Sequence, residues 1–81
     1  MEIQREQVES SNLYSIGYDS ESETLEIQFR AKGESENPIP GDVYRYFEVP
    51  FSVWTEFKET ESKGKYFHTY IRNGGYRFEK Q

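Results

Sequence analysis

Residues 42–50, DVYRYFEVP, form the densest run of β-branched and aromatic side chains in the chain. Such side chains favour extended strands, in which successive side chains point to opposite faces of a sheet. One face then carries two valines and Phe47 together with Arg45, and is typical of a core. The other carries Tyr44 and Tyr46, and is typical of a half-exposed aromatic surface. In the alternative arrangement, the two tyrosines lie under the helices and Phe47 faces outward.

Two further strands are predicted before this stretch. Residues 24–30, TLEIQFR, alternate between apolar and polar side chains, which is the period of a strand with one buried face. Residues 12–18, NLYSIGY, form the first strand, and the polar residues 19–23 join the two strands as a hairpin. Residues 31–41 contain two glycines and two prolines and predict a loop. Together with the strand over residues 42–49, these segments predict an antiparallel meander.

Two short helices are predicted after Pro50, a residue that ends a strand and suits the first turn of a helix. Apolar side chains recur at helical spacing in residues 50–60. A second helix is predicted over residues 63–72, because Ser62 is a candidate N-cap and two glycines follow the segment. The remaining residues 76–78 indicate either a last short strand or a docked tail.

The predicted fold class is α+β: a three-stranded antiparallel β-meander followed by two short helices packed on one face (β-β-β-α-α). We expect the helices to cover the sheet face that carries Leu25, Ile27 and Phe29. Residues 1–9 are mostly polar and predict a flexible N-terminal segment, with a short edge strand as the alternative. Residues 10–78 are expected to form a single domain. Such a chain buries only about 60–65 per cent of its unfolded surface, so its seven tyrosines, six phenylalanines and one tryptophan fill a small core.

Several short motifs follow one another along the chain: Ser10-Ser11-Asn12, Ile16-Gly17-Tyr18-Asp19, Tyr44-Arg45-Tyr46, Val49-Pro50, Ser62, Gly64, Tyr66-Phe67 and Ile71-Arg72. Their order and spacing resemble the KTSC domain family. The family is a short domain named after the C-terminal extension of some lysyl-tRNA synthetases. It also occurs as a small bacterial or phage protein with a central Tyr-x-Tyr motif, and its function is not established. This chain departs from the family in residues 31–41, AKGESENPIPG, where members usually have a short turn with glycine.

The resemblance implies a small non-catalytic binding module, and its synthetase context implies RNA or tRNA as the partner. Unpaired RNA is bound by aromatic rings that stack on bases and by cations that contact phosphates. The start of the second predicted helix offers unpaired N–H groups, two lysines and a glycine, which together suit an anion. The candidate RNA- or anion-binding residues are Tyr44, Arg45, Tyr46, Lys63, Gly64, Lys65, Tyr66 and Arg72.

Two alternatives to this hypothesis stay open. Tyr44 and Tyr46 also suit a role in covering the sheet, and the lysines also suit solvated positions on a helix. In a regular strand, moreover, Arg45 points away from both tyrosines, so the three do not form one patch. The alternative function is a protein–protein interaction module that uses exposed aromatic side chains or an open sheet edge.

The distribution of charge restricts where a polyanion can bind. Residues 1–62 carry fourteen acidic and five basic side chains, a net charge of −9, whereas residues 63–81 carry five basic and one acidic, a net charge of +4. The whole chain, at −5, is not expected to attract nucleic acid non-specifically. A local basic face near the C-terminal end is the expected contact region.

Catalysis, metal binding and membrane insertion are not expected. The chain has no cysteine, which excludes disulfides and cysteine-based zinc sites and fits a cytoplasmic location. No apolar run approaches the roughly 20 residues of a membrane-spanning helix, and no signal peptide is predicted. His68 has no identifiable catalytic partner and is expected to be exposed. Residues 19–23 lack the glycine and bidentate glutamate of a calcium loop and predict a solvated turn. No cofactor is expected.

Overall fold

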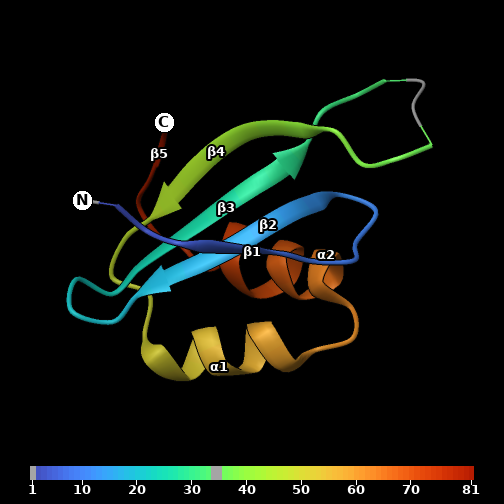
Figure 1. Cartoon of the computed structure of the whole chain (residues 1–81). Coiled ribbons are helices and arrows are strands. Elements are labelled where there is room, and N and C mark those ends of the chain that lie inside the picture. Colours follow the sequence, from blue (N-terminus) through green and yellow to red (C-terminus); the bar gives the residue numbers. More distant parts are fainter. Residues whose placement is uncertain (1, 34–35) are drawn as a thin grey trace.

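Alternating apolar side chains produce two of the interior strands of an antiparallel sheet (Figure 1). The computed structural model describes residues 2–33 and 36–81. Within them, the chain forms a sheet of order β1-β2-β3-β4-β5. Its strands are β1 (Arg5–Gln7), β2 (Leu13–Asp19), β3 (Thr24–Arg30), β4 (Pro40–Tyr46) and β5 (Phe78–Lys80). Figure 1 shows the helices gathered on one side of this sheet.

The α+β class is confirmed, but the prediction of three strands is wrong, because the sheet also contains β1 and β5. Each of the two added strands has three residues, too few to show an alternating pattern. β1 pairs with β2, so residues 5–7 form the edge strand that was the alternative to a flexible segment. β5 pairs with β4, and this pairing places Phe78 opposite Tyr46. Of the two alternatives for the C-terminal segment, the structure has a strand, which begins at Phe78.

The prediction that Val43, Phe47 and Arg45 face the core is also wrong. β3 and β4 pair with Leu25 opposite Tyr46 and with a second such pair one step along, Ile27 opposite Tyr44. Paired residues of neighbouring strands share a face of the sheet. The tyrosines therefore lie on the helix-covered side, as the alternative arrangement had it, and Tyr46 is only 6% exposed.

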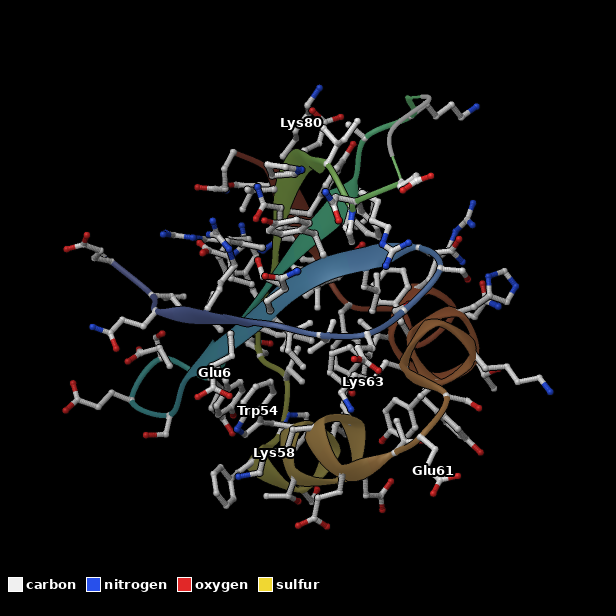
Figure 2. The ribbon with its side chains drawn as sticks, turned by 45° about the vertical axis from the view of Figure 1, so that its right-hand side comes forward. Glu6, Trp54, Lys58, Glu61, Lys63 and Lys80 are labelled. Carbon is white, nitrogen blue, oxygen red and sulfur yellow. The ribbon has the colours of Figure 1, made fainter. Side chains whose placement is uncertain are left out.

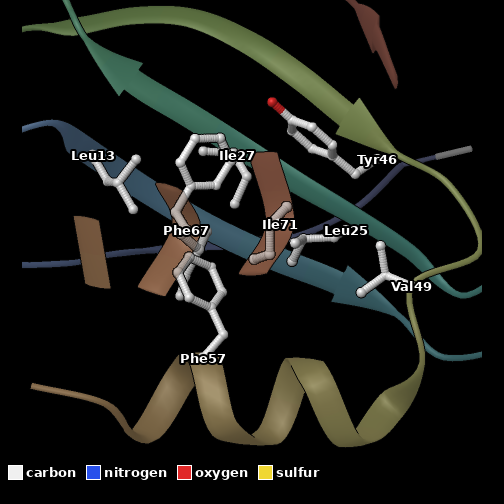
Figure 3. Packing of buried hydrophobic residues seen from close by; sticks show 9 residues of the cluster. Leu13, Leu25, Ile27, Tyr46, Val49, Phe57, Phe67 and Ile71 are labelled. Carbon is white, nitrogen blue, oxygen red and sulfur yellow. The ribbon is translucent and has the colours of Figure 1, made fainter. Parts of the chain in front are cut away.

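The strand period breaks at Glu48, which explains why Val49 nevertheless reaches the core. β4 ends at Tyr46, and Glu48 adopts a positive φ of 56°. This left-handed residue redirects the backbone, and Val49 becomes fully buried. Figure 3 shows Val49 beside Leu25 at the point where the chain leaves the sheet for the first helix.

Two helical segments cover the tyrosine face of the sheet. α1 (Phe51–Glu59) points Phe57 into the core (Figure 3). α2 (Lys63–Tyr66) continues directly into η1 (Phe67–Arg72), a wider π-helical segment. The second predicted helix is thus present but changes its hydrogen-bond period at Phe67. Phe67 and Ile71 are buried from η1. The shared core is completed by residues of both layers: Leu13, Ile16, Leu25, Ile27, Tyr46, Val49 and Phe57.

Two connections join the strands β2, β3 and β4: a turn between β2 and β3, and a loop between β3 and β4. The turn after β2 is held by Asp19, whose carboxylate accepts hydrogen bonds from Ser22 N–H (3.0 Å) and Oγ (2.5 Å). These bonds lower the pKa of Asp19. The loop predicted over residues 31–41 is shorter than expected, because the Ala31 N–H donates to Ile39 O (2.8 Å) and β4 begins at Pro40. Residues 34–35 of that loop lie outside the described residues.

Candidate functional site

The tyrosine side of the sheet opens into a cleft of about 500 Å³ where β4 and β5 meet the end of η1. We call this hollow the aromatic cleft. It is lined by Phe29, Tyr44, Tyr46, Phe67, Arg72, Asn73 and Phe78. Five of these side chains are aromatic, and the two polar ones come from the C-terminal end of the helical layer. Segments far apart in sequence therefore combine ring faces with a cation at one place.

Strand register explains how the rings come together. Ile27 faces Tyr44 and Tyr46 faces Phe78, so neighbouring strands present their side chains on the same face. Phe78 lies 5.5 Å from Tyr46 and 6.1 Å from Tyr44, measured between ring centroids. Phe29 packs edge-on against Tyr44 at 5.6 Å. These edge-on and tilted ring contacts fix the ring orientations and prearrange the walls of the cleft.

Burial is graded across the aromatic cleft. Tyr46 and Phe67 are buried at its inner side, 5.6 Å apart, whereas Phe78 is 56% exposed. Arg72 is exposed at the end of η1. Burial raises the pKa of Tyr46, Tyr44 adds to the rise, and the Arg72 guanidinium opposes it. Tyr46 is therefore a neutral wall of the cleft at physiological pH, and Phe78 is the ring face open to a ligand.

A second hollow of about 340 Å³ lies at the start of α2. We call it the lysine hollow. It is lined by Glu9, Ser10, Ser11, Asn12, Glu61, Ser62, Lys63, Gly64 and Lys65. Figure 2 labels Glu61, on the segment that joins α1 to α2, and Lys63, the first residue of α2. The Lys63 ammonium donates a hydrogen bond to Thr60 O (2.9 Å), which leaves the exposed Lys65 as the more available cation.

Packing in the lysine hollow does not require a glycine at position 64. A Cβ at this position would lie 3.4 Å from Ser10 Oγ and 3.5 Å from Asn12 Nδ2, which are ordinary contact distances. Ser10 Oγ in turn accepts hydrogen bonds from the backbone N–H groups of Asn12 and Leu13, both at 3.2 Å. The two carboxylates in the lining reduce the attraction of this hollow for an anion.

The remaining two predicted residues lie elsewhere. Tyr66 links the helices, because its hydroxyl donates to Glu56 Oε2 at 2.8 Å and its ring stacks on Phe57 at 5.6 Å. Burial, followed by the Glu56 contact, raises the pKa of Tyr66 to about 12. Arg45 lies on the opposite face of the sheet, where its Nε donates to Glu26 Oε1 at 2.7 Å.

The structure thus gathers Tyr44, Tyr46 and Arg72 in the aromatic cleft, and the two lysines with Gly64 in the lysine hollow. Sequence reasoning missed four other residues that line the cleft: Phe29, Phe67, Asn73 and Phe78. Phe29 was assigned from the sequence to the core face of a strand and Phe67 to the second predicted helix. Phe78 belongs to a strand of three residues and gives no periodic signal.

Other kinds of site find little support in residues 2–33 and 36–81. His68 is exposed. No three His, Asp or Glu side chains in that part of the chain are grouped so that they suit a metal ion. A search of the same residues finds no helix whose length and apolar content would let it cross a membrane.

Comparison with known proteins identifies relatives over nearly the whole chain. A family model described as "KTSC domain" matches residues 9–76. The lysine–tRNA ligase of Trichormus variabilis is 35% identical over 72 residues, which are 89% of this chain and 11% of that ligase. An uncharacterized protein of Stutzerimonas stutzeri is 33% identical over 76 residues, 94% of each chain. The crystal structure of the KTSC domain protein YPO2434 from Yersinia pestis matches with a TM-score of 0.80, 36% identity and 99% coverage of both chains.

Proposed function

The chain belongs to the KTSC domain family, and from that premise we propose that it is a small non-catalytic module that binds unpaired RNA, tRNA included. The aromatic cleft is the observation that carries this proposal. It combines an open ring face, Phe78, with further aromatic walls and with the Arg72 guanidinium. Proteins bind single-stranded nucleic acid through this combination, since bases stack on the rings and phosphates meet the cation.

Charge supports the same placement. Arg72 ends η1, Arg77 precedes β5 and Lys80 ends it, all in the part of the chain that carries a net positive charge. Arg77 faces Glu79 at 3.6 Å and Lys80 faces Asp42 at 3.5 Å, so part of this charge is balanced. We therefore expect modest affinity that depends on salt, as for a contact to a few phosphates. Lys65 at the lysine hollow is a further candidate phosphate contact.

The printed names of the relatives support an RNA partner. Three matches are lysine–tRNA ligases, and this chain spans about a tenth (11%) of their length. The part that matches is therefore a small region of each ligase. We propose that it contributes nucleic-acid binding rather than catalysis, and that this chain acts in the cytoplasm in the same way.

An amide NMR titration tests this function. Single-stranded hexa-adenylate and mixed tRNA are added to the full chain at low salt and then at raised salt. We expect shifts at Tyr44, Arg72 and Phe78 that weaken as salt is added. Phe78→Ala should lower the affinity about tenfold, because one stacked base contributes about 1–3 kcal/mol. Arg72→Gln should lower both the affinity and its salt dependence.

Phe51→Ala is the matched control, since Phe51 is also a phenylalanine and is 55% exposed, but it lies on α1 outside the cleft. Its affinity should equal that of the parent chain. Equal losses for both phenylalanines, or an RNA titration without shifts, would contradict the proposal. In that case the alternative, a protein-interaction module that uses the exposed aromatic side chains and the short edge strands, is tested by retention of a protein partner.

A further inference from the structure

The aromatic cleft contains a cation that no carboxylate in its lining balances. Arg72 is the charged residue of that lining, and none of the ion pairs in the described part of the chain includes it. The lysine hollow, by contrast, has two carboxylates for its two lysines. The Arg72 guanidinium is therefore available to a phosphate, to which it can offer several N–H donors in a planar fork.

Asn73 places an amide beside this cation, at the end of η1. Its side chain lines the cleft, is exposed, and forms no hydrogen bond within residues 2–33 and 36–81. The turn that holds it is tied to the helix, because the Gly74 N–H donates to Ile71 O at 3.2 Å. A primary amide presents an acceptor and a donor side by side. The cleft can therefore read the hydrogen-bonding edge of a base as well as its ring face.

The cleft has room on its rings for one base. Phe78 is 56% exposed, whereas Tyr46 and Phe67 are buried. Phe29 and Tyr44 are half-buried and form walls. One open ring, one available guanidinium and one amide correspond to the three parts of a single nucleotide contact: stacking, a phosphate and a base edge.

Adenine is the base whose polar groups this set of residues satisfies best. It has one exocyclic polar group, the N6 amino group, which lies beside the ring acceptor N7. An asparagine amide accepts from N6 and donates to N7 at the same time. Guanine, cytosine and uracil each have two exocyclic polar groups. The second group would lose water against aromatic walls without gaining a partner, which is costly.

We propose, on the basis of the RNA-binding function above, that the aromatic cleft holds one adenine nucleotide of the bound strand. The base stacks on Phe78, the Asn73 amide pairs with its N6 and N7 atoms, and Arg72 contacts a phosphate. Stacking and charge alone bind any sequence, so Asn73 is the residue that makes the site selective.

The experiment is a set of amide NMR titrations of the full chain with hexa-adenylate, hexa-uridylate, 5′-AMP and 5′-GMP. We expect saturable shifts at Phe78 and at the side-chain amide of Asn73. The dissociation constant of hexa-adenylate should be about tenfold lower than that of hexa-uridylate, the effect of one bidentate contact. That of 5′-AMP should lie within about tenfold of hexa-adenylate, because the cleft takes one base.

Asn73→Asp tests the amide without changing its shape. A carboxylate has no N–H to donate to adenine N7, but it accepts from the N1–H and N2–H groups of guanine. The added charge weakens both mononucleotides, so the readout is the ratio of their affinities. The preference for 5′-AMP over 5′-GMP should fall about tenfold. Asn12→Asp makes the same change at an exposed asparagine outside the cleft and should leave this ratio unchanged.

The outcomes separate the adenine site from RNA binding as such. Equal affinities for the two hexanucleotides, or an unchanged ratio in Asn73→Asp, would overturn the adenine site and leave RNA binding intact. Absence of shifts with every ligand would overturn both. Binding of 5′-AMP without binding of hexa-adenylate would support the adenine site for the free nucleotide and would contradict the RNA-binding function.

Discussion

At the scale of single residues, Glu48 adopts a backbone conformation that glutamate tolerates poorly. Its φ of 56° is in the left-handed region, which costs a residue with a Cβ roughly 1–2 kcal/mol. Glycine avoids this cost but loses about 0.4–1 kcal/mol through greater freedom of the unfolded chain. We expect Glu48→Gly to raise the free energy of unfolding by about 0.5 kcal/mol, as measured by urea denaturation.

Glu48→Ala is the control for this prediction, because alanine also removes the exposed carboxylate but keeps the Cβ. It should be no more stable than the parent chain. Stabilisation of equal size in the two variants would indicate a charge effect, and would contradict a backbone origin. Glu48 is also the residue at which the strand prediction failed. Alternation gives no sign of a left-handed glutamate, so Val49 was assigned to the same face as Val43, whereas it packs in the core on the helix side.

At the scale of secondary-structure elements, β1 depends on a glycine in its neighbour. A Cβ at Gly17 would overlap the backbone carbonyl of Gln4 and crowd the Ile3 side chain. We expect Gly17→Ala to displace the N-terminal segment and to lower the free energy of unfolding by about 1–3 kcal/mol, the range for overpacked sites. Hydrogen exchange at Arg5 and Gln7 should accelerate more than exchange at the core of β3.

Gly64→Ala is the matched substitution for comparison. The space at Gly64 accepts a Cβ, and alanine favours a helix over glycine by about 0.8–1 kcal/mol in a helix interior. Its stability should therefore be equal or higher, while Gly17→Ala loses stability. The same sign for both changes would show that the contact with Gln4 does not limit β1.

The elements were predictable in proportion to their length. β2 and β3 have seven residues each, so their period is visible, and α1 has helical spacing over nine residues. β1 and β5 have three residues each and depend on backbone pairing and on partners such as Glu26. The change from α2 to η1 at Phe67 leaves no mark on an apolar stripe that repeats every three or four residues. Tertiary packing selects these features, and periodicity does not report them.

At the scale of the whole molecule, the sequence pointed to three of the seven residues that line the aromatic cleft, but not to the other four. Tyr44, Tyr46 and Arg72 were expected to act in binding, and the structure puts them around one cleft. The cleft also requires Phe78, which reaches Tyr46 only because β5 adds to the sheet edge. Both helices lie between β4 and β5 in the chain, so the pairing of these two strands cannot be predicted from any local sequence pattern. Arg45, assigned to the same site, instead pairs with Glu26 on the opposite face.

Tyrosine hydroxyls connect the layers of the molecule, and this gives stability a specific dependence on alkaline pH. Tyr18 donates to Val49 O at 2.6 Å, and Tyr66 donates to Glu56 at 2.8 Å, so the sheet joins the start of α1 and α1 joins α2. Burial is the largest cause of the raised pKa of Tyr18, Tyr46 and Tyr66, and that of Tyr66 rises to about 12.

A raised pKa means that the folded chain retains a proton which the unfolded chain releases near pH 10. The contribution of these tyrosines to stability is therefore fully present below about pH 10, and it is lost as the pH rises from there through about 12.

We expect the tyrosine contribution to the urea midpoint to stay constant up to pH 9 and to fall between pH 10 and 12. The Tyr66→Phe variant should be less stable at pH 8. Its urea midpoint should fall less steeply between pH 10 and 12, because residue 66 then has no hydroxyl proton to lose. The difference in ultraviolet absorbance between the parent chain and Tyr66→Phe should place the ionisation of Tyr66 near pH 12, above the usual value of about 10 for tyrosine. Equal slopes in the two chains, or ionisation of Tyr66 near pH 10, would contradict a hydroxyl that holds α1 to α2.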